Sequence, residues 1–130
     1  MIKTKTIKQV ITFKVSPSVV YNALMDSKTH SKFTGGKASI SKRVGGKFTA
    51  FDEYCSGENL ELVDGKRIVQ SWTATEWPKG HYSKVTYELK KDGIGTKLLF
   101  TQTGVPIEYY KSILQGWKDY YWNPMKEMFN

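Results

Sequence analysis

Residues 106–129 read PIEYYKSILQGWKDYYWNPMKEMF, and the spacing of apolar residues in this closing stretch decides the fold. Bulky apolar side chains recur every three or four residues, which is the period of an amphipathic helix. The stripe consists of Ile107, Tyr110, Ile113, Leu114, Trp117, Tyr120, Tyr121, Met125 and Met128. Because it is wide and its rings carry polar tips, we expect a sheet that curves around the helix and leaves room for a cavity beside it.

Pro124 interrupts this helical pattern near its end. Proline has no backbone N–H, and its ring clashes with the preceding helical turn. We therefore expect a kink or a break after Trp122, with Met125, Met128 and Phe129 packing as a separate final turn.

The beginning of the sequence has the pattern of one strand followed by two short helices. Apolar and polar residues alternate over Thr4–Val15, as they do in a strand with one face in water. Ser16 then stands at a helix cap position and Pro17 at the first helical position, ahead of an apolar stripe over two turns. A second short helix is predicted to begin at Asp26, which can cap it, and to end at Gly35–Gly36.

After these glycines, alternation replaces helical spacing until the closing helix. The expected strands are Ala38–Arg43, Lys47–Tyr54, Gly57–Val63, Arg67–Trp77, Tyr82–Lys90 and Thr96–Thr103. Glycine-containing turns separate them, and short connections make sequential strands antiparallel. We predict an α+β fold with about six to seven strands in the order β-α-α-β-β-β-β-β-β-α. The residues expected to face the helix are Ile7, Ile11, Phe13, Phe48, Trp72, Val85, Tyr87, Leu89, Leu98 and Phe100.

The length of 130 residues fits one domain over residues 1–130, with a core large enough to fold without disulfides or metal. The single cysteine, Cys55, has no partner for an internal bridge, and the start MIKTKTIKQV lacks the apolar run of a secretory signal. No stretch approaches the roughly 20 apolar residues needed to cross a bilayer. We expect a soluble, cytoplasmic monomer without a membrane segment.

Twenty Lys and Arg residues against twelve Asp and Glu residues give a formal net charge of +8, which favours anionic partners. Eighteen of the twenty basic residues are lysines, and no basic run is longer than Lys90–Lys91. Nucleic-acid readout relies mainly on the planar fork of arginine. A solvated lysine surface is therefore favoured over a nucleic-acid site, and an acidic protein is the expected kind of partner.

Residues able to perform catalysis are present but scattered. His30 and His81 have no metal-binding spacing, so we expect no metal, with His30 on the exposed side of the second helix and His81 in a turn. Cys55 is expected to be a small buried hydrophobe. Asp52 and Tyr54 share the parity of Phe48, which would aim them inward, although a strand end or a bulge explains their spacing equally well. No constellation requires an enzyme or a cofactor.

Aromatic residues are the strongest candidates for a binding role, because flat apolar walls with a few hydrogen-bonding tips are typical of sites for apolar small molecules. The candidate cavity-lining residues are Trp72, Phe100, Tyr110, Leu114, Trp117 and Tyr121. The same rings at helical spacing are also what a core needs. Core packing with little open space and a ligand cavity both remain open at this stage.

An ordered series of motifs carries a family resemblance over essentially the whole chain. The motifs are Ser16-Pro17 with Tyr21, Ala23 and Leu24; Phe33-Thr34-Gly35-Gly36; Val44-Gly45-Gly46-Lys47-Phe48; Arg67-Ile68-Val69-Gln70-Ser71-Trp72; Gly95-Thr96 with Leu98; Gln102-Thr103-Gly104-Val105-Pro106; Tyr110; and Gly116-Trp117. In this order they resemble the C-terminal-type domain of the activator of the heat-shock protein 90 ATPase, within the START-like, birch-pollen-allergen-like (SRPBCC) superfamily.

The resemblance implies a helix-grip fold, in which a curved antiparallel sheet wraps around a C-terminal helix. It also implies a non-enzymatic co-chaperone role in the stress response, with heat-shock protein 90 as a partner. The alternative function is a carrier or sensor of a small apolar ligand held between sheet and helix. An enzyme of the cyclase or hydrolase kind that this superfamily sometimes hosts ranks last. The eukaryotic activator has a separate N-terminal domain, whereas this sequence is expected to start at the first strand of the C-terminal-type domain.

Overall fold

The computed structural model describes residues 2–129 and confirms the α+β class and the expected order of elements. Seven strands form one antiparallel sheet in the spatial order β1-β7-β6-β5-β4-β3-β2. The strands are β1 (Thr4–Phe13), β2 (Ser39–Ile40), β3 (Lys47–Ala50), β4 (Cys55–Val63), β5 (Arg67–Ala74), β6 (Ser83–Asp92) and β7 (Gly95–Pro106). The helices are α1 (Pro17–Met25), α2 (Ser27–Thr34), η1 (Ile107–Tyr109), α3 (Tyr110–Trp117), η2 (Lys118–Trp122) and α4 (Asn123–Met128).

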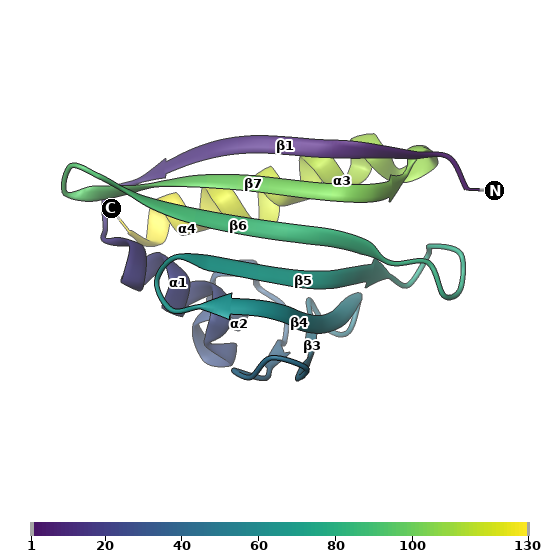
Figure 1. Ribbon diagram of the computed structural model, residues 1–130, viewed down its shortest axis with the longest axis horizontal. Helices are drawn as coiled ribbons and strands as arrows, with labels where there is room; N and C mark the ends of the chain where they lie inside the picture. The colour runs from purple at the N-terminus through teal and green to yellow at the C-terminus, as the bar shows by residue number, and fades with distance from the viewer. Residues whose placement is uncertain (1, 130) are drawn as a thin grey trace.

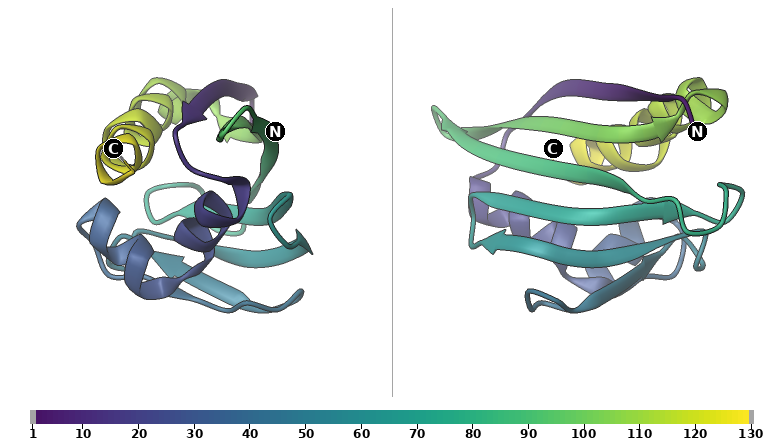
Figure 2. Two further views of the ribbon diagram at one scale, coloured as in Figure 1. Left: turned by 90° about the vertical axis from the view of Figure 1, so that its left-hand side faces the viewer. Right: turned by 45° about the vertical axis from the view of Figure 1, so that its right-hand side comes forward.

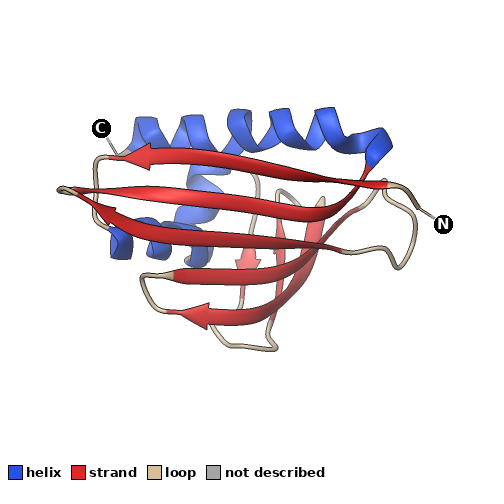
Figure 3. Cartoon of the chain, turned by 45° about the horizontal axis from the view of Figure 1, so that its top comes forward, coloured by secondary structure: helices blue, strands red, loops and turns tan. Residues whose placement is uncertain are grey.

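All the helices lie on one side of the curved sheet. The terminal helix, η1 through α4, runs along β1 and β7, while α1 and α2 cover the other part of the same face (Figure 1). The end-on view in Figure 2 shows the sheet bending around these helices. Figure 3 shows the terminal helix extending along most of the length of the long strands. This arrangement is the predicted clasp of a sheet around a terminal helix.

Alternation along the strands explains which side chains form the core. Side chains of successive strand residues point to opposite faces, so every second residue faces the helices. All ten residues predicted to face the closing helix are buried, with exposed fractions of 6% or less. Paired residues such as Ile11 and Leu98 contribute from neighbouring strands at the same level. The predicted core of the sheet is therefore confirmed.

The terminal helix changes its winding immediately before Pro124, as the sequence suggested. Residues 118–122 form a π-helical turn, and Pro124 lies in the first turn of α4. The wider turn places residues five apart on one face, and the rings of Trp117 and Trp122 stack with centroids 5.6 Å apart. Trp122, which the expected stripe did not include, is therefore buried, whereas Tyr120 is 46% exposed.

The strand predicted over Lys47–Tyr54 ends earlier, at Ala50. Phe51, Asp52 and Glu53 follow with positive φ angles of 53°, 57° and 67°, which end the alternation. Of the two interpretations of Asp52, an inward side chain and a strand end, the structure bears out the strand end. The Asp52 side chain is exposed, and its Oδ1 accepts a hydrogen bond from the backbone N–H of Lys37 at 2.9 Å. The strand predicted over Arg67–Trp77 is likewise shorter and ends at Ala74.

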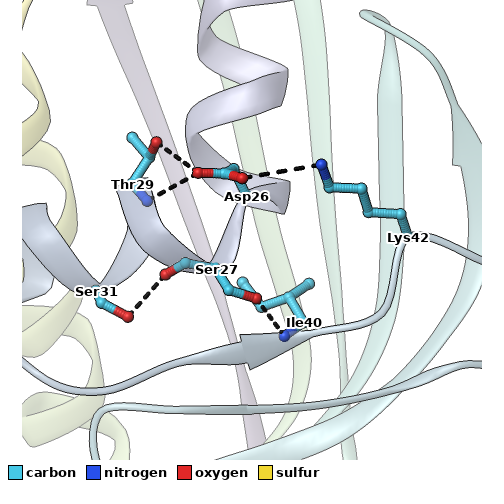
Figure 4. Close-up of polar contacts among 6 residues, drawn as sticks. All are labelled: Asp26, Ser27, Thr29, Ser31, Ile40 and Lys42. Atoms are coloured by element: carbon cyan, nitrogen blue, oxygen red, sulfur yellow. Dashed lines mark hydrogen bonds and ion pairs between the residues drawn. The ribbon is translucent and has the colours of Figure 1, made fainter.

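Asp26 caps α2 as predicted, and nearby contacts tie this helix to β2 (Figure 4). Asp26 Oδ2 accepts hydrogen bonds from the backbone N–H and the hydroxyl of Thr29, at 2.9 and 2.7 Å. These bonds lower the pKa of the Asp26 carboxyl, and Lys42 Nζ lies 3.8 Å from its other oxygen. The Ser27 hydroxyl accepts from the backbone N–H of Ile40 at 2.8 Å. At α1, by contrast, the Ser16 side chain makes no capping hydrogen bond, and its carbonyl accepts from the backbone N–H groups of Val19 and Val20.

Two glutamine side chains, the buried Gln102 and the half-buried Gln9, hold the indole rings of the terminal helix in place. Trp117 Nε1 donates to Gln102 Oε1 at 2.8 Å, and Gln102 Nε2 donates to the Ser83 hydroxyl at 3.0 Å. Trp122 Nε1 donates to Gln9 Oε1 at 2.7 Å. Because buried polar groups are costly without partners, these bonds specify one orientation of each ring against the sheet.

Candidate functional site

Aromatic rings fill the centre of the space between sheet and helix. The Trp117 ring lies 4.4 Å, centroid to centroid, from both Phe100 and Tyr121, and 5.9 Å from Trp72. All four residues are 9% exposed or less. Close packing of these rings leaves no room for a large ligand in the middle of the grip.

A small crevice of about 130 Å³ remains beside this cluster. One wall is the helix, with Ile113, Gly116 and Trp117, and the other contains Cys55 and Trp72 at the ends of β4 and β5. Phe51, Tyr54, Ser112, Tyr120 and Tyr121 complete the lining. The site is therefore built from the rim of the sheet and the middle of the terminal helix.

The structure brings three of the six candidate lining residues together at the crevice, namely Trp72, Trp117 and Tyr121. Phe100 is 1% exposed and lies in the core against Trp117. Tyr110 and Leu114 lie elsewhere on the helix. Lys5 Nζ lies 4.4 Å from the centroid of the Tyr110 ring, and the Leu114 carbonyl accepts a hydrogen bond from Gln9 on β1.

Seven of the ten lining residues are absent from the candidate set, and Phe51 and Gly116 show two different reasons. Phe51 reaches the crevice only because the backbone leaves the strand after Ala50, and alternation contains no signal for that departure. Gly116 is different, because a glycine inside a helical pattern costs helix stability and can mark a position where space is needed. The position of Gly116 beside Trp117 in the helical pattern was the sequence signal that could have identified it as a lining residue.

A hydrogen-bonded cluster fixes the polar rim of the crevice. The Tyr54 hydroxyl donates to the Glu76 carboxylate, and the Tyr109 hydroxyl donates to the Glu76 carbonyl at 2.9 Å. Burial, and then the bond to the Glu76 carboxylate, raise the pKa of Tyr54. The Tyr54 phenol therefore stays neutral near pH 7 and serves as a fixed donor.

Cys55 is 3% exposed, which agrees with its expected role as a small buried hydrophobe. Burial raises the pKa of its thiol to about 12, and the Sγ atom lies 3.7 Å from the Ala50 carbonyl. Only the thiolate is strongly nucleophilic. The Cys55 thiol is therefore a poor nucleophile at neutral pH.

The prediction that His30 lies on an exposed helix face is wrong. Its side chain is 4% exposed and packs 5.0 Å from the Phe33 ring and 5.1 Å from the Tyr121 ring. Desolvation lowers the pKa of His30 to about 4, and its Nδ1 has no hydrogen-bond partner among residues 2–129. The short α2 packs against the terminal helix, so the face assigned to solvent is covered.

His81 lies in the loop before β6, as predicted, with Nε2 2.7 Å from the Gly104 carbonyl. In the described part of the chain, no three His, Cys, Asp or Glu side chains gather as a metal site would require. Across the same residues, no helix combines the length and the apolar character that a bilayer span needs.

A larger groove of about 850 Å³ runs between α1, the end of β4 and the end of the terminal helix. The Asp26–Lys42 ion pair lies on its wall (Figure 4), and Val19, Leu62 and Phe129 supply apolar surface. One surface ion pair contributes little free energy. Among the described residues of its lining, the titratable side chains are those of Tyr21, Asp26, Lys42 and Asp64.

Comparisons with known proteins agree with this architecture. The model of a family described as activator of Hsp90 ATPase homolog 1-like protein matches residues 14–130. The human activator of 90 kDa heat shock protein ATPase homolog 1 is 32% identical over 118 residues, which are 91% of this chain and 35% of that protein. The Dictyostelium discoideum homolog is 32% identical over 128 residues, 98% of this chain and 33% of that protein. The chain thus spans about a third of the length of these relatives.

A solved structure, that of PFC0360w, an HSP90 activator from Plasmodium falciparum, has the same fold. It superposes with a TM-score of 0.89 at 26% identity, and the match covers 95% of this chain and 94% of that chain. This likeness confirms the predicted helix-grip fold.

Proposed function

We propose that this chain, which belongs to the activator of Hsp90 ATPase homolog 1-like family, is a non-enzymatic module that binds a heat-shock protein 90 chaperone in the cytoplasm. The family match over residues 14–130 carries the proposal. The likeness to the Plasmodium falciparum HSP90 activator supports it, because it covers nearly all of both chains. The proposed unit is one monomeric domain spanning residues 1–130.

The charge distribution supports binding to an acidic protein. The net charge is +8, and Lys42 is the one lysine within residues 2–129 that lies within ion-pair distance of a carboxylate. Lys90 and Lys97 stand directly opposite each other on β6 and β7, on the face of the sheet away from the helices. Like charges in such pairs repel, and a partner's carboxylates would relieve that repulsion.

We expect the purified chain to bind its cognate heat-shock protein 90 and to raise the chaperone's rate of ATP hydrolysis. Because the expected contact is electrostatic and largely exposed, binding should weaken as the salt concentration rises from about 0.05 to about 0.5 M. Calorimetry measures binding, and a coupled assay measures hydrolysis. An unrelated protein of similar size and charge serves as the control. Absence of both binding and a change in hydrolysis would reject the proposal.

A second function, binding of a small apolar molecule, is favoured by one observation, the open crevice beside Trp72, Trp117 and Tyr121. These three side chains would form the wall of the site. Native mass spectrometry of the purified protein should then detect a retained or added apolar ligand, with quenching of the tryptophan fluorescence. A chain that takes up no such ligand would count against this function.

A further inference from the structure

The loop formed by residues 51–53 contributes Phe51 to the lining of the crevice and has an unusual backbone conformation. Three consecutive residues that are not glycine, Phe51, Asp52 and Glu53, have positive φ angles. Such conformations are costly for side chains with a Cβ, and they persist only where the surroundings impose them. Strain of this kind is concentrated at clamps and switch regions.

The surroundings of this loop show what imposes the conformation. Asp52 is bonded to Lys37 twice, through Oδ1 to the Lys37 N–H and through its own N–H to the Lys37 carbonyl at 3.0 Å. Any side chain on Gly36 would collide with Phe51. The absence of a Cβ at Gly36 thus allows the Phe51 backbone to approach closely.

This anchoring holds Phe51, which lines the crevice, against the terminal helix. The ring lies 4.8 Å from the Tyr120 ring on the helix and 6.3 Å from the Tyr54 ring, centroid to centroid. Tyr120 is 46% exposed, so this contact is made at the surface. Phe51 and Tyr120 therefore form a bridge of two rings between the sheet rim and the helix.

Gly116 also lines the crevice and leaves space that a side chain would occupy. A Cβ at this position would meet only the Tyr120 ring, at 4.0 Å. A helix with alanine there would be more stable by helix propensity alone. The glycine therefore keeps the crevice open at some cost to the helix.

The size and chemistry of the crevice define what it can hold. Its volume of about 130 Å³ approaches that of an apolar cavity of about 150 Å³ that stays dry and binds benzene. No charged side chain of the described residues lines it, and most of its wall is aromatic. Ser112 and three tyrosines are the lining residues that carry hydroxyl groups. These features match a neutral single ring with at most one hydroxyl.

We propose that this crevice is a binding site for one neutral aromatic ring of phenol size, and that Phe51 is the lid that must swing aside to admit it. The inference rests on the second function above and names its ligand class and its gate. The Tyr54 hydroxyl is held by its hydrogen bond to the Glu76 carboxylate, so we expect Tyr54 to stay in place when Phe51 moves.

Cys55 lies in the crevice wall and is the sole cysteine, so its alkylation reports directly on access. With iodoacetamide, the sulfur–carbon bond forms as iodide leaves, and the thiol proton passes to the buffer. Mass spectrometry follows the reaction in the folded protein. Because the pKa of Cys55 is raised to about 12, the baseline rate is expected to be slow.

Phe51→Ala should speed alkylation about tenfold or more, because it removes the lid. Phenol at about ten times its Kd should slow alkylation about tenfold in both proteins. Gly116→Leu should fill the crevice, keep alkylation slow and abolish the effect of phenol. Val44→Ala, at an exposed turn remote from the crevice, is the matched control and should behave as the unchanged chain. Circular dichroism checks that each variant is folded.

Each outcome is decisive. An unchanged alkylation rate in folded Phe51→Ala would overturn the lid, and phenol that fails to protect Cys55 would overturn the ring site. If native mass spectrometry detects another apolar ligand while phenol gives no protection, the binding function survives and this inference fails. If neither experiment detects a ligand, both fail.

Discussion

Trp117→Ala is expected to lower the free energy of unfolding by about 3–5 kcal/mol. The ring is 3% exposed and contacts Trp72, Phe100, Tyr121 and Trp122, so its removal leaves a cavity that rigid neighbours cannot fill. Loss of the indole also leaves the buried Gln102 Oε1 atom without its hydrogen-bond donor. Urea denaturation followed by circular dichroism measures the change.

The matched control is Tyr120→Ala, on the next turn of the same helix but 46% exposed. It should cost much less than Trp117→Ala, because nearly half of the Tyr120 side chain already contacts water. A domain typically has only about 5–15 kcal/mol of stability, so the tryptophan variant is expected to be marginally folded. Equal and small losses in the two variants would place the Trp117 ring outside the core.

Acidification should destabilise the protein through His30. Burial lowers the pKa of this side chain from 6.5 to about 4, so the folded state favours the neutral ring, while the unfolded chain takes up a proton below about pH 6.5. The stabilisation is complete above pH 6.5 and is lost as the pH falls toward 4. The free energy of unfolding should drop by about 2–3 kcal/mol between about pH 7 and pH 4.5.

Urea denaturation at a series of pH values measures this dependence. His30→Leu should remove most of the slope in this window, because no imidazole remains to be protonated. His81→Gln serves as the control, since it deletes the other histidine and should leave the slope in place. A slope that persists in His30→Leu would assign the acid sensitivity to other groups.

Period-two alternation was sufficient to predict the sheet, because it determines which side chains of a strand share a face. Val85, Leu98 and the other predicted core residues needed no knowledge of the tertiary structure. The Asp26 cap could also be predicted from the sequence, because a carboxylate just before a helix accepts a hydrogen bond from a backbone N–H that has no partner within the helix. The wide aromatic stripe of the closing helix predicted a sheet that curves around it, and the family resemblance implied the same helix-grip fold.

Other features depend on tertiary contacts or on a change of backbone geometry. The helix stripe placed Tyr120 inside and omitted Trp122, because ideal spacing fails across a π-helical turn. His30 was assigned to solvent since nothing in α2 signals that the terminal helix covers it. Phe51 joins the crevice only through its left-handed backbone. The sequence therefore predicted the buried aromatic residues of the site, Trp72, Trp117 and Tyr121, but not Phe51.

The clasp of the curved sheet around the ring-bearing face of the terminal helix is the central claim, and nuclear Overhauser effects test it most directly. The Trp117 ring protons should show strong effects to Phe100 and Tyr121, whose ring centroids lie 4.4 Å away. The Trp122 indole N–H should show nuclear Overhauser effects to side-chain protons of Gln9, which lies on β1. Absence of these effects, together with rapid solvent exchange of both indole protons, would contradict the clasp.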